Sequence, residues 1–89
     1  FDNEGSEIHT IIEIETRDRL GLLYDLAKTL SNNYISISSA IIATFGEQAV
    51  DTFYVKDLFG LKLHSLSKRE KLEHKLKEAI QAGTLIDPY

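Results

Sequence analysis

Chemistry-bearing residues gather in one short stretch of this chain, residues 16–23, which reads TRDRLGLL. An apolar, β-branched run ends just before it and leucines at helical spacing begin inside it, so the stretch predicts a turn from a strand into a helix. Asp18 is the expected N-cap, because its carboxylate can accept a hydrogen bond from the free amides of a first helical turn. Gly21 lacks a Cβ, which lets a ligand or a neighbouring chain approach the positive end of the helix dipole. The stretch therefore predicts a small anion site, with an ordinary capped helix start as the alternative.

Other reactive side chains lack the spacing that catalysis or metal binding requires. His9, His64 and His74 fall in three different predicted segments, without the close spacing of a zinc site. The chain has no cysteine, which removes thiolate nucleophiles and Cys-based metal sites. Since no nucleophile has a base beside it, we expect no catalytic residue, no metal and no cofactor in this chain.

Composition suits one small domain of a longer protein. The 89 residues carry a net charge of −4, which disfavours non-specific binding to nucleic acid or to an anionic membrane. No apolar run approaches the roughly 20 residues that span a bilayer, and we expect a cytoplasmic protein. The chain begins at Phe1 and has no methionine, so we expect a fragment of a longer protein.

The first half of the chain predicts a strand followed by a helix. Residues 1–7 are polar and are expected to form a linker. Apolar and polar residues alternate over residues 8–15, which predicts a strand. Leucines at helical spacing predict a helix over residues 22–31, with Asn32 and Asn33 as residues that tolerate a left-handed end.

Two further strands are predicted next, joined by a hairpin. The first covers residues 35–44, and its alternation changes phase at residues 38–39, which predicts a β-bulge. Residues 45–48 contain a glycine and predict a hairpin loop. Residues 49–56 are rich in β-branched and aromatic side chains, which indicates the third strand.

A second helix is predicted after a turn at residues 57–60. Ser67 and Glu70 match a capping box and place the helix start at Ser67. Gly83 is expected to end the helix in a left-handed cap, which leaves residues 84–86 for a short last strand. The predicted inward stripe is Leu72, Leu76, Ala79 and Ile80, and Glu73 and Lys77 form a favourable i,i+4 pair.

This order predicts an α+β fold with two helices on one face of an antiparallel sheet. It is close to the ferredoxin-like βαββαβ plan, with the last strand short or absent. We expect the domain to cover residues 8–86 and residues 87–89 to form a tail.

The sequence also resembles a known family, the ACT domains. The residues that carry the resemblance are Asp18, Arg19, Gly21, Leu22 and Leu23; Ile37, Ser39, Ala40, Ile42 and Thr44; and Gly46, Glu47, Val50, Asp51, Phe53, Tyr54, Val55 and Asp57. More narrowly, the chain resembles the C-terminal ACT domain of the bacterial protein-PII uridylyltransferase/uridylyl-removing enzymes, in which a T-x-G-E hairpin leads into D-x-F-Y-V-x-D. The resemblance covers residues 10–80.

The resemblance implies a regulatory domain that binds an amino acid. ACT domains bind free amino acids at an interface between two ACT units, and in this enzyme family tandem ACT domains sense glutamine. The signal switches a parent enzyme, a nucleotidyltransferase that needs Mg²⁺ and also has a uridylyl-removing hydrolase activity, between modifying and releasing PII protein. In that setting the amides of Leu20, Gly21 and Leu22 are expected to meet the ligand carboxylate, and Asp18 its ammonium or side-chain amide.

Two departures from the family pattern affect this expectation. Leu20 stands where the family usually has proline. Because leucine does not fix φ in advance, forming the turn costs a few tenths to about 1 kcal/mol more than it would with proline. A missing last strand would leave the first strand as an uncovered edge.

One face of the predicted sheet indicates a protein partner. Ile11, Ile41 and Tyr54 are expected to face away from the two helices, which favours an interface with a second ACT unit, in tandem or as a homodimer. Scattered exposed apolar residues are the alternative, because they are normal on any surface.

Three other functions stay open. The chain could be an ACT-type dimerisation module that binds no ligand. An RRM-like nucleic-acid module shares the fold plan, but residues 52–55 lack the basic residue and the glycine of its RNP1 pattern. A small hydrolase of the acylphosphatase type would use Arg17 and Arg19 near the turn, although only one glycine accompanies them.

Overall fold

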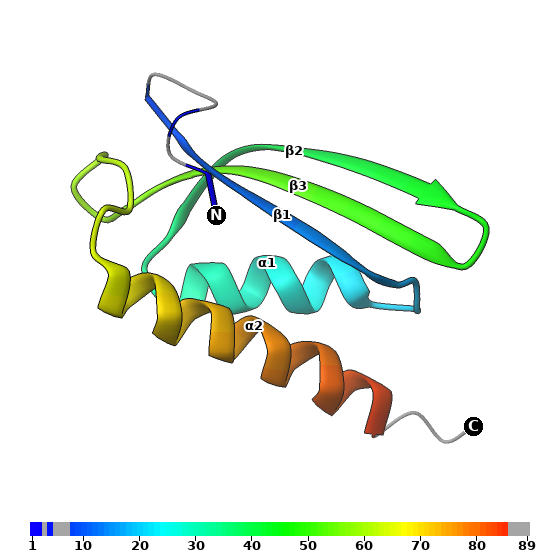
Figure 1. Cartoon of the computed structure of the whole chain (residues 1–89). Coiled ribbons are helices and arrows are strands. Elements are labelled where there is room, and N and C mark those ends of the chain that lie inside the picture. The colour runs from blue at the N-terminus through cyan, green and yellow to red at the C-terminus, as the bar shows by residue number, and fades with distance from the viewer. Residues whose placement is uncertain (3, 5–7, 86–89) are drawn as a thin grey trace.

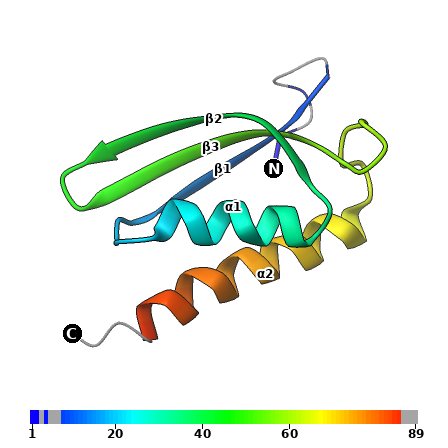
Figure 2. The same ribbon diagram turned by 180° about the vertical axis from the view of Figure 1, so that it is seen from behind.

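The computed structural model describes residues 1, 2, 4 and 8–85. Its elements are β1 (Thr10–Arg17), α1 (Leu22–Asn32), β2 (Ser36–Phe45), β3 (Gln48–Lys56) and α2 (Leu66–Leu85). The strands form an antiparallel sheet in the order β1-β3-β2. Both helices lie on the same face of this sheet (Figures 1 and 2). The predicted α+β, ferredoxin-like arrangement is confirmed.

Strand alternation divides the sheet into an inner and an outer face. Ile12 pairs with Phe53 on the face toward the helices, and both side chains are buried. Their neighbours Ile11 and Tyr54 pair with each other on the opposite, outer face. The strand begins two residues later than predicted, because β1 pairs with β3 only from Thr10 onward, and Ile8 is exposed before it.

The predicted β-bulge is confirmed in β2. The register with β3 shifts between Ile37 and Ser39, so the extra residue is Ser38. The hairpin to β3 closes on the pair Phe45 and Gln48, and Gly46 has φ 62°. A positive φ at the first of two loop residues fits a type II′ turn, which requires glycine there.

The core lies between the inner face of the sheet and the helices. From α1 it takes leucines at helical spacing, and from α2 it takes Leu72 and Leu76, as the sequence predicts. Leu26 and Leu30 have no exposed surface, and burial of each stabilises the fold by about 1.5–3 kcal/mol. The buried hydrophobic set is Ile12, Leu22, Leu26, Leu30, Ala49, Phe53, Val55, Leu63, Leu72 and Leu76.

The start of α2 differs from the prediction. The helix begins at Leu66, and Ser65 caps it: its Oγ accepts a hydrogen bond from the Lys68 amide at 3.3 Å. Ser67 lies inside the first turn, so the predicted Ser67–Glu70 capping box is wrong. The competing serine two residues earlier supplies the cap, since it directly precedes the first helical residue.

The end of α2 also differs from the prediction. The helix continues through Gly83 to Leu85. Gly83 is therefore not a terminal cap, because a glycine inside a helix costs only about 1 kcal/mol relative to alanine and does not by itself end one. Thr84 and Leu85 are helical rather than part of a last strand, and Ile86 lies outside the described residues. The predicted ion pair between Glu73 and Lys77 is confirmed, with 3.4 Å between its charged atoms.

The left-handed residue after α1 is Tyr34, with φ 62°, and not Asn32 or Asn33 as predicted. Asn33 instead serves the helix end directly. Its amide donates to the carbonyls of Thr29 and Leu30, and its side-chain Nδ2 donates to the Thr29 carbonyl at 2.7 Å. The left-handed residue that ends the helix is therefore Tyr34, one residue after Asn33.

The free edge of β1 has a short backbone partner. Asp2 and Ile11 exchange two backbone hydrogen bonds of 2.7 Å, which places Asp2 where a fourth strand would add to the sheet. The expected uncovered edge is thus paired at this one position. Within the described residues, no helix combines the length and the apolar character needed to cross a membrane.

Candidate functional site

The predicted corner is a tight turn between β1 and α1. The Leu22 amide donates to the Arg19 carbonyl at 3.2 Å, and Gly21 has φ 78° and ψ 2°. These angles match the third residue of a type II turn, about +80° and 0°, where glycine is required. Leu20 occupies the second position of the turn, and its side chain is 99% exposed. Proline is common at that second position, which gives a physical reason for the family's preference there.

Asp18 is not the helix N-cap, contrary to the prediction. Because the type II turn intervenes, α1 begins at Leu22 and its N-cap is Gly21, for which no side-chain capping bond is described. The first intrahelical bond runs from the Asp25 amide to the Gly21 carbonyl. The amide of Asp18 donates to the Glu47 carbonyl at 2.7 Å, which ties the corner to the β2–β3 hairpin, while the Asp18 side chain is exposed.

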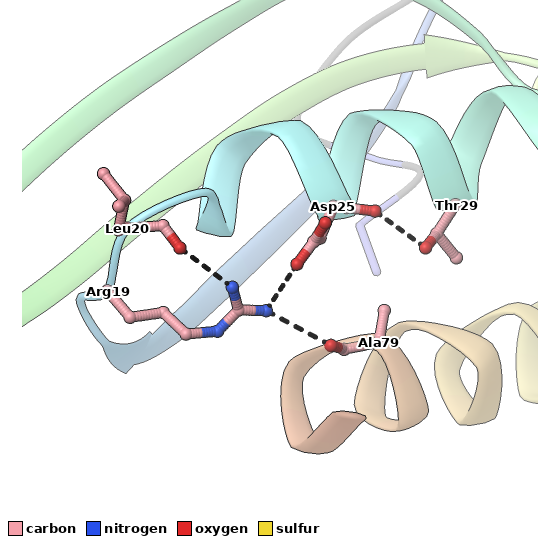
Figure 3. Close-up of polar contacts among 5 residues, drawn as sticks. All are labelled: Arg19, Leu20, Asp25, Thr29 and Ala79. Atoms are coloured by element: carbon pink, nitrogen blue, oxygen red, sulfur yellow. Dashed lines mark hydrogen bonds and ion pairs between the residues drawn. The ribbon is translucent and has the colours of Figure 1, made fainter. Parts of the chain in front are cut away.

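Arg19 fixes the corner to both helices, as Figure 3 shows. Its Nη2 donates to Asp25 Oδ2 at 2.8 Å and to the Ala79 carbonyl of α2 at 3.2 Å, and its Nη1 donates to the Leu20 carbonyl. The side chain is only 15% exposed. From the sequence, Arg19 was identified as part of the family pattern and as a possible phosphate ligand, but not as a link between the two helices. The available signal was an acidic residue, Asp25, in the first turn of the following helix.

Asp51 is the second residue whose importance the sequence reasoning missed. It lies on β3 between Ile14 and Ile42, on the face toward the helices, and it is 2% exposed. Its Oδ1 has no hydrogen-bond partner among the described residues. Burial, together with the negative charge of Asp18, raises the pKa of the Asp51 carboxyl above its ordinary value. The signal in the sequence was a carboxylate within an inward stripe that is otherwise apolar.

The corner places backbone amides next to a carboxylate. The backbone amides of Leu20 and Gly21 lie just before α1, the Leu22 amide donates to the Arg19 carbonyl, and the Leu22 side chain is buried in the core. The Asp18 carboxylate supplies a negative charge beside them. Such an arrangement suits a ligand with one anionic group and one hydrogen-bond donor or cation.

The structure weakens two alternatives. Arg19 is committed to Asp25 and Ala79, and Arg17 pairs with Glu47 at 3.2 Å, so neither arginine is free to cradle a phosphate as an acylphosphatase would require. Of the two aromatic residues of β3, Tyr54 faces outward, whereas Phe53 is buried in the core. An RRM-type stacking surface needs exposed aromatic residues on the sheet.

The three predicted interface residues share the outer face of the sheet. Ile11 and Tyr54 are half-buried neighbours, and Ile41 lies on the edge strand β2 with 56% of its surface exposed. The His9 ring packs edge-on against Tyr54 with 6.2 Å between centroids. The predicted placement of these three side chains away from the helices is confirmed.

Comparison with known proteins matches residues 1–86 to a family model described as an ACR9-like, ACT-like domain. The chain is 65% identical over 83 residues to the bifunctional uridylyltransferase/uridylyl-removing enzyme of Cereibacter sphaeroides and 63% identical to that of Ruegeria pomeroyi, covering 93% of this chain in both cases. The corresponding enzyme of Azospirillum brasilense is 51% identical over 80 residues, or 90% of this chain.

The chain spans only about 9% of the length of these relatives. Its match to the family model, by contrast, covers nearly every residue. Together with the β-α-β-β-α order and the glycine corner before α1, these matches show that the chain belongs to the family of ACT-like domains.

Proposed function

We propose that this chain is the regulatory, glutamine-binding ACT domain of a cytoplasmic bifunctional uridylyltransferase/uridylyl-removing enzyme. In this proposal it reports nitrogen supply to the parent enzyme, which attaches uridylyl groups to PII protein and removes them. The chain itself is non-catalytic, and the Mg²⁺-dependent chemistry belongs to other parts of the parent. The relatives' names and their high identity to this chain support the choice of parent.

The observation that carries the proposal is the glycine N-cap of α1. A helix start leaves its first amides without intrahelical partners, and a polar side chain usually satisfies one of them. Gly21 has no side chain to do so, and no capping bond is described for it. The ligand's carboxylate would take that place at the positive end of the helix dipole, close to the amides of Leu20 and Gly21, since the Leu22 amide already donates to the Arg19 carbonyl at 3.2 Å.

The acidic residues around the corner favour glutamine over glutamate. The exposed Asp18 carboxylate would accept hydrogen bonds from the ligand's ammonium or side-chain amide. Asp51, buried close enough for Asp18 to raise its pKa, adds negative potential beneath the corner whenever it is ionised. A second carboxylate on the ligand would be repelled by these groups, whereas a neutral amide would not.

In this proposal, Arg19 transmits ligand binding at the corner to α2, and through α2 to the rest of the parent enzyme. It connects the Leu20 carbonyl, the first turn of α1 and the Ala79 carbonyl of α2 (Figure 3). A ligand that shifts Leu20 would disturb the hydrogen bonds of Arg19 and thereby change how α2 packs against α1. A second ACT unit on the outer face would complete the regulatory assembly.

A pairing module that binds no ligand is the second candidate. The apolar residues of the outer face, Ile11, Ile41 and Tyr54, favour it, because both helices among the described residues lie on the opposite face. Pairing and ligand binding are separable, so one experiment can distinguish the two candidates.

Calorimetric titration of the 89-residue chain with L-glutamine and L-glutamate tests the proposal. We expect saturable binding of glutamine and at least about tenfold weaker binding of glutamate. Asp18→Asn should weaken glutamine binding by about tenfold or more, because it removes a charge-assisted hydrogen bond. Glu13→Gln, an exposed substitution on the preceding strand β1, is the matched control and should leave binding unchanged.

The same titration on a longer chain that includes a tandem ACT neighbour locates the rest of the site. Glutamine binding by the longer chain alone would assign half the site to the neighbour. If neither chain binds any amino acid, the sensing role is wrong and the pairing module is the better description.

A further inference from the structure

A second site lies at the end of the molecule opposite the glycine corner. A cavity of about 310 Å³ opens where the end of α1, the β3–α2 connection and the start of α2 meet. Figures 1 and 2 show this end in both views, with the β1–α1 turn and the β2–β3 hairpin at the far end. The cavity is lined by Asn33, Tyr34, Ile35, Asp57, Leu58, Phe59, Leu63, Lys68, Lys71 and Leu72.

The cavity wall is locally well ordered. Asp57 Oδ1 accepts hydrogen bonds from the amides of Phe59 and Leu61 at 2.8 and 2.9 Å, which holds the connecting loop in a compact turn. The Leu63 amide donates to the buried hydroxyl of Thr10 at 2.8 Å, which anchors the connection to β1. On the other side, Tyr34 adopts the left-handed conformation, which is uncommon for an aromatic residue and turns the chain around the cavity.

The lining combines apolar side chains with unpaired positive charge. Leu63 and Leu72 are buried and form apolar wall, while Leu58 and Phe59 are held exposed at the rim. Lys68 and Lys71 also line the cavity, and within the part of the chain that the structure describes neither ammonium group has a hydrogen-bond or ion-pair partner. The one carboxylate in the lining, Asp57, accepts two backbone amides of its own loop on Oδ1, so the two lysines leave the lining with a net positive charge.

We propose that this cavity binds a small organic carboxylate with a compact apolar body. The apolar body would lie against Ile35, Phe59 and Leu72, and the carboxylate would lie between the ammonium groups of Lys68 and Lys71. A volume of about 310 Å³ is at the lower end of the range of small-molecule sites, roughly 300–1,000 Å³, and limits the ligand's size. Because the lining shares no residue with the corner, this site is independent of the proposed glutamine binding.

Methyl-detected NMR titration of the 89-residue chain with 3-phenylpropionate tests this site. We expect saturable shifts of the Ile35, Leu63 and Leu72 methyl groups, with the Leu22 methyls at the corner unaffected. The neutral analogue 3-phenylpropan-1-ol should bind at least about tenfold more weakly, because it cannot form charge-assisted hydrogen bonds.

Paired variants identify the groups that recognise the carboxylate. Lys68→Gln with Lys71→Gln should weaken 3-phenylpropionate binding by about tenfold or more without unfolding the chain, because both side chains are exposed and unpaired. Lys28→Gln with Lys75→Gln removes the same charge away from the cavity lining and should leave binding unchanged.

Three results would overturn the site. Equal binding of the alcohol and the acid would mean that charge is not recognised. Absence of saturable shifts in the cavity methyl groups would mean that the cavity takes no such ligand. Shifts of these methyl groups that follow protein concentration without any probe would identify a second copy of the chain as the occupant.

Discussion

At the scale of single residues, the corner contains buried polar atoms that the fold leaves unsatisfied. Arg19 Nε and Asp51 Oδ1 are both buried without a hydrogen-bond partner among the described residues. A buried polar atom left without a partner destabilises a fold by about 1–3 kcal/mol. Arg19 lies in the turn itself and Asp51 lies on β3 opposite Ile14, and each makes the fold less stable than an apolar residue at its position would. We infer that these two polar residues are present, despite the loss of stability, because their charges set the electrostatic field at the corner.

Asp51 should make stability depend on pH in an unusual direction for a carboxylate. Its pKa is raised in the folded state, so between the ordinary value of 3.8 and the raised value the folded chain binds more protons than the unfolded chain. The free energy of unfolding contributed by this group therefore decreases as the pH rises through that window. We expect the free energy of unfolding of the wild-type chain, minus that of Asp51→Asn, to fall as the pH rises above the ordinary value of 3.8 in urea denaturation.

Two variants test the cause of this pH dependence. Asp18→Asn should reduce the slope, because the Asp18 charge is the second cause of the raised pKa. Glu13→Gln should leave it unchanged. A difference that is flat with pH, or that rises, would show that Asp51 does not titrate as the buried geometry requires.

The type II turn predicts opposite effects for substitutions at two neighbouring positions. Leu20→Pro should raise the free energy of unfolding by about 0.4–1 kcal/mol, because proline fits the second position of such a turn and restricts the unfolded chain. Gly21→Ala should lower it by about 1–2 kcal/mol through the positive φ. The added methyl would meet only Arg19 Nη1, at 4.0 Å, so this cost is torsional rather than steric. A destabilising Leu20→Pro in thermal or urea unfolding would contradict the turn assignment.

At the scale of elements, the two serines near the start of α2 have different roles. Ser65→Ala should lower the free energy of unfolding by about 0.5–2 kcal/mol, because it removes the bond from Ser65 Oγ to the Lys68 amide. Ser67→Ala should change it by less than about 0.5 kcal/mol, since Ser67 is exposed in the first turn and alanine is the better helix former. Urea denaturation of both variants measures the difference. If Ser67→Ala lowered the free energy of unfolding more than Ser65→Ala, the capping box predicted at Ser67 would be correct after all.

Strands and core stripes could be predicted from sequence because each depends on repeated burial. An alternation such as Ile12 and Ile14, which pair with Phe53 and Asp51, remains recognisable even if one residue in it is misinterpreted. The same is true of a helical stripe such as Leu72 and Leu76. The bulge at Ser38 was visible for the same reason, since a single inserted residue changes the phase of the whole strand.

Helix ends could not be predicted as well, because they depend on competition between near neighbours. Ser65 and Ser67 both suit a cap, and Asp18 and Gly21 are only three residues apart, so a difference of about 1 kcal/mol selects the start. The turn from strand to helix was predicted within residues 16–23, and it lies there, at residues 19–22. The roles of Arg19 and Asp51 depend on contacts between distant segments, such as Arg19 with Ala79, which the local sequence pattern does not contain.

At the scale of the whole molecule, the sheet exposes apolar surface that the two helices do not cover. The helices occupy the inner face (Figures 1 and 2), and the outer face carries Ile11, Ile41 and Tyr54. The inner face is also incompletely covered at the edge strand, where Ile42 is 46% exposed. The two neighbouring isoleucines of β2 therefore have similar exposure and point to opposite faces, which makes them a matched pair for testing where a partner binds.

Ile41→Lys should weaken self-association of the 89-residue chain by about tenfold or more, because it would bury a charge in an apolar interface on the outer face. Ile42→Lys places the same charge one residue away on the inner face and should leave association unchanged. Sedimentation velocity across a range of protein concentrations measures both, and circular dichroism checks that each variant remains folded. Stronger weakening by Ile42→Lys would move the interface to the helix side of β2. A wild-type chain that stays monomeric throughout would contradict self-pairing through the outer face.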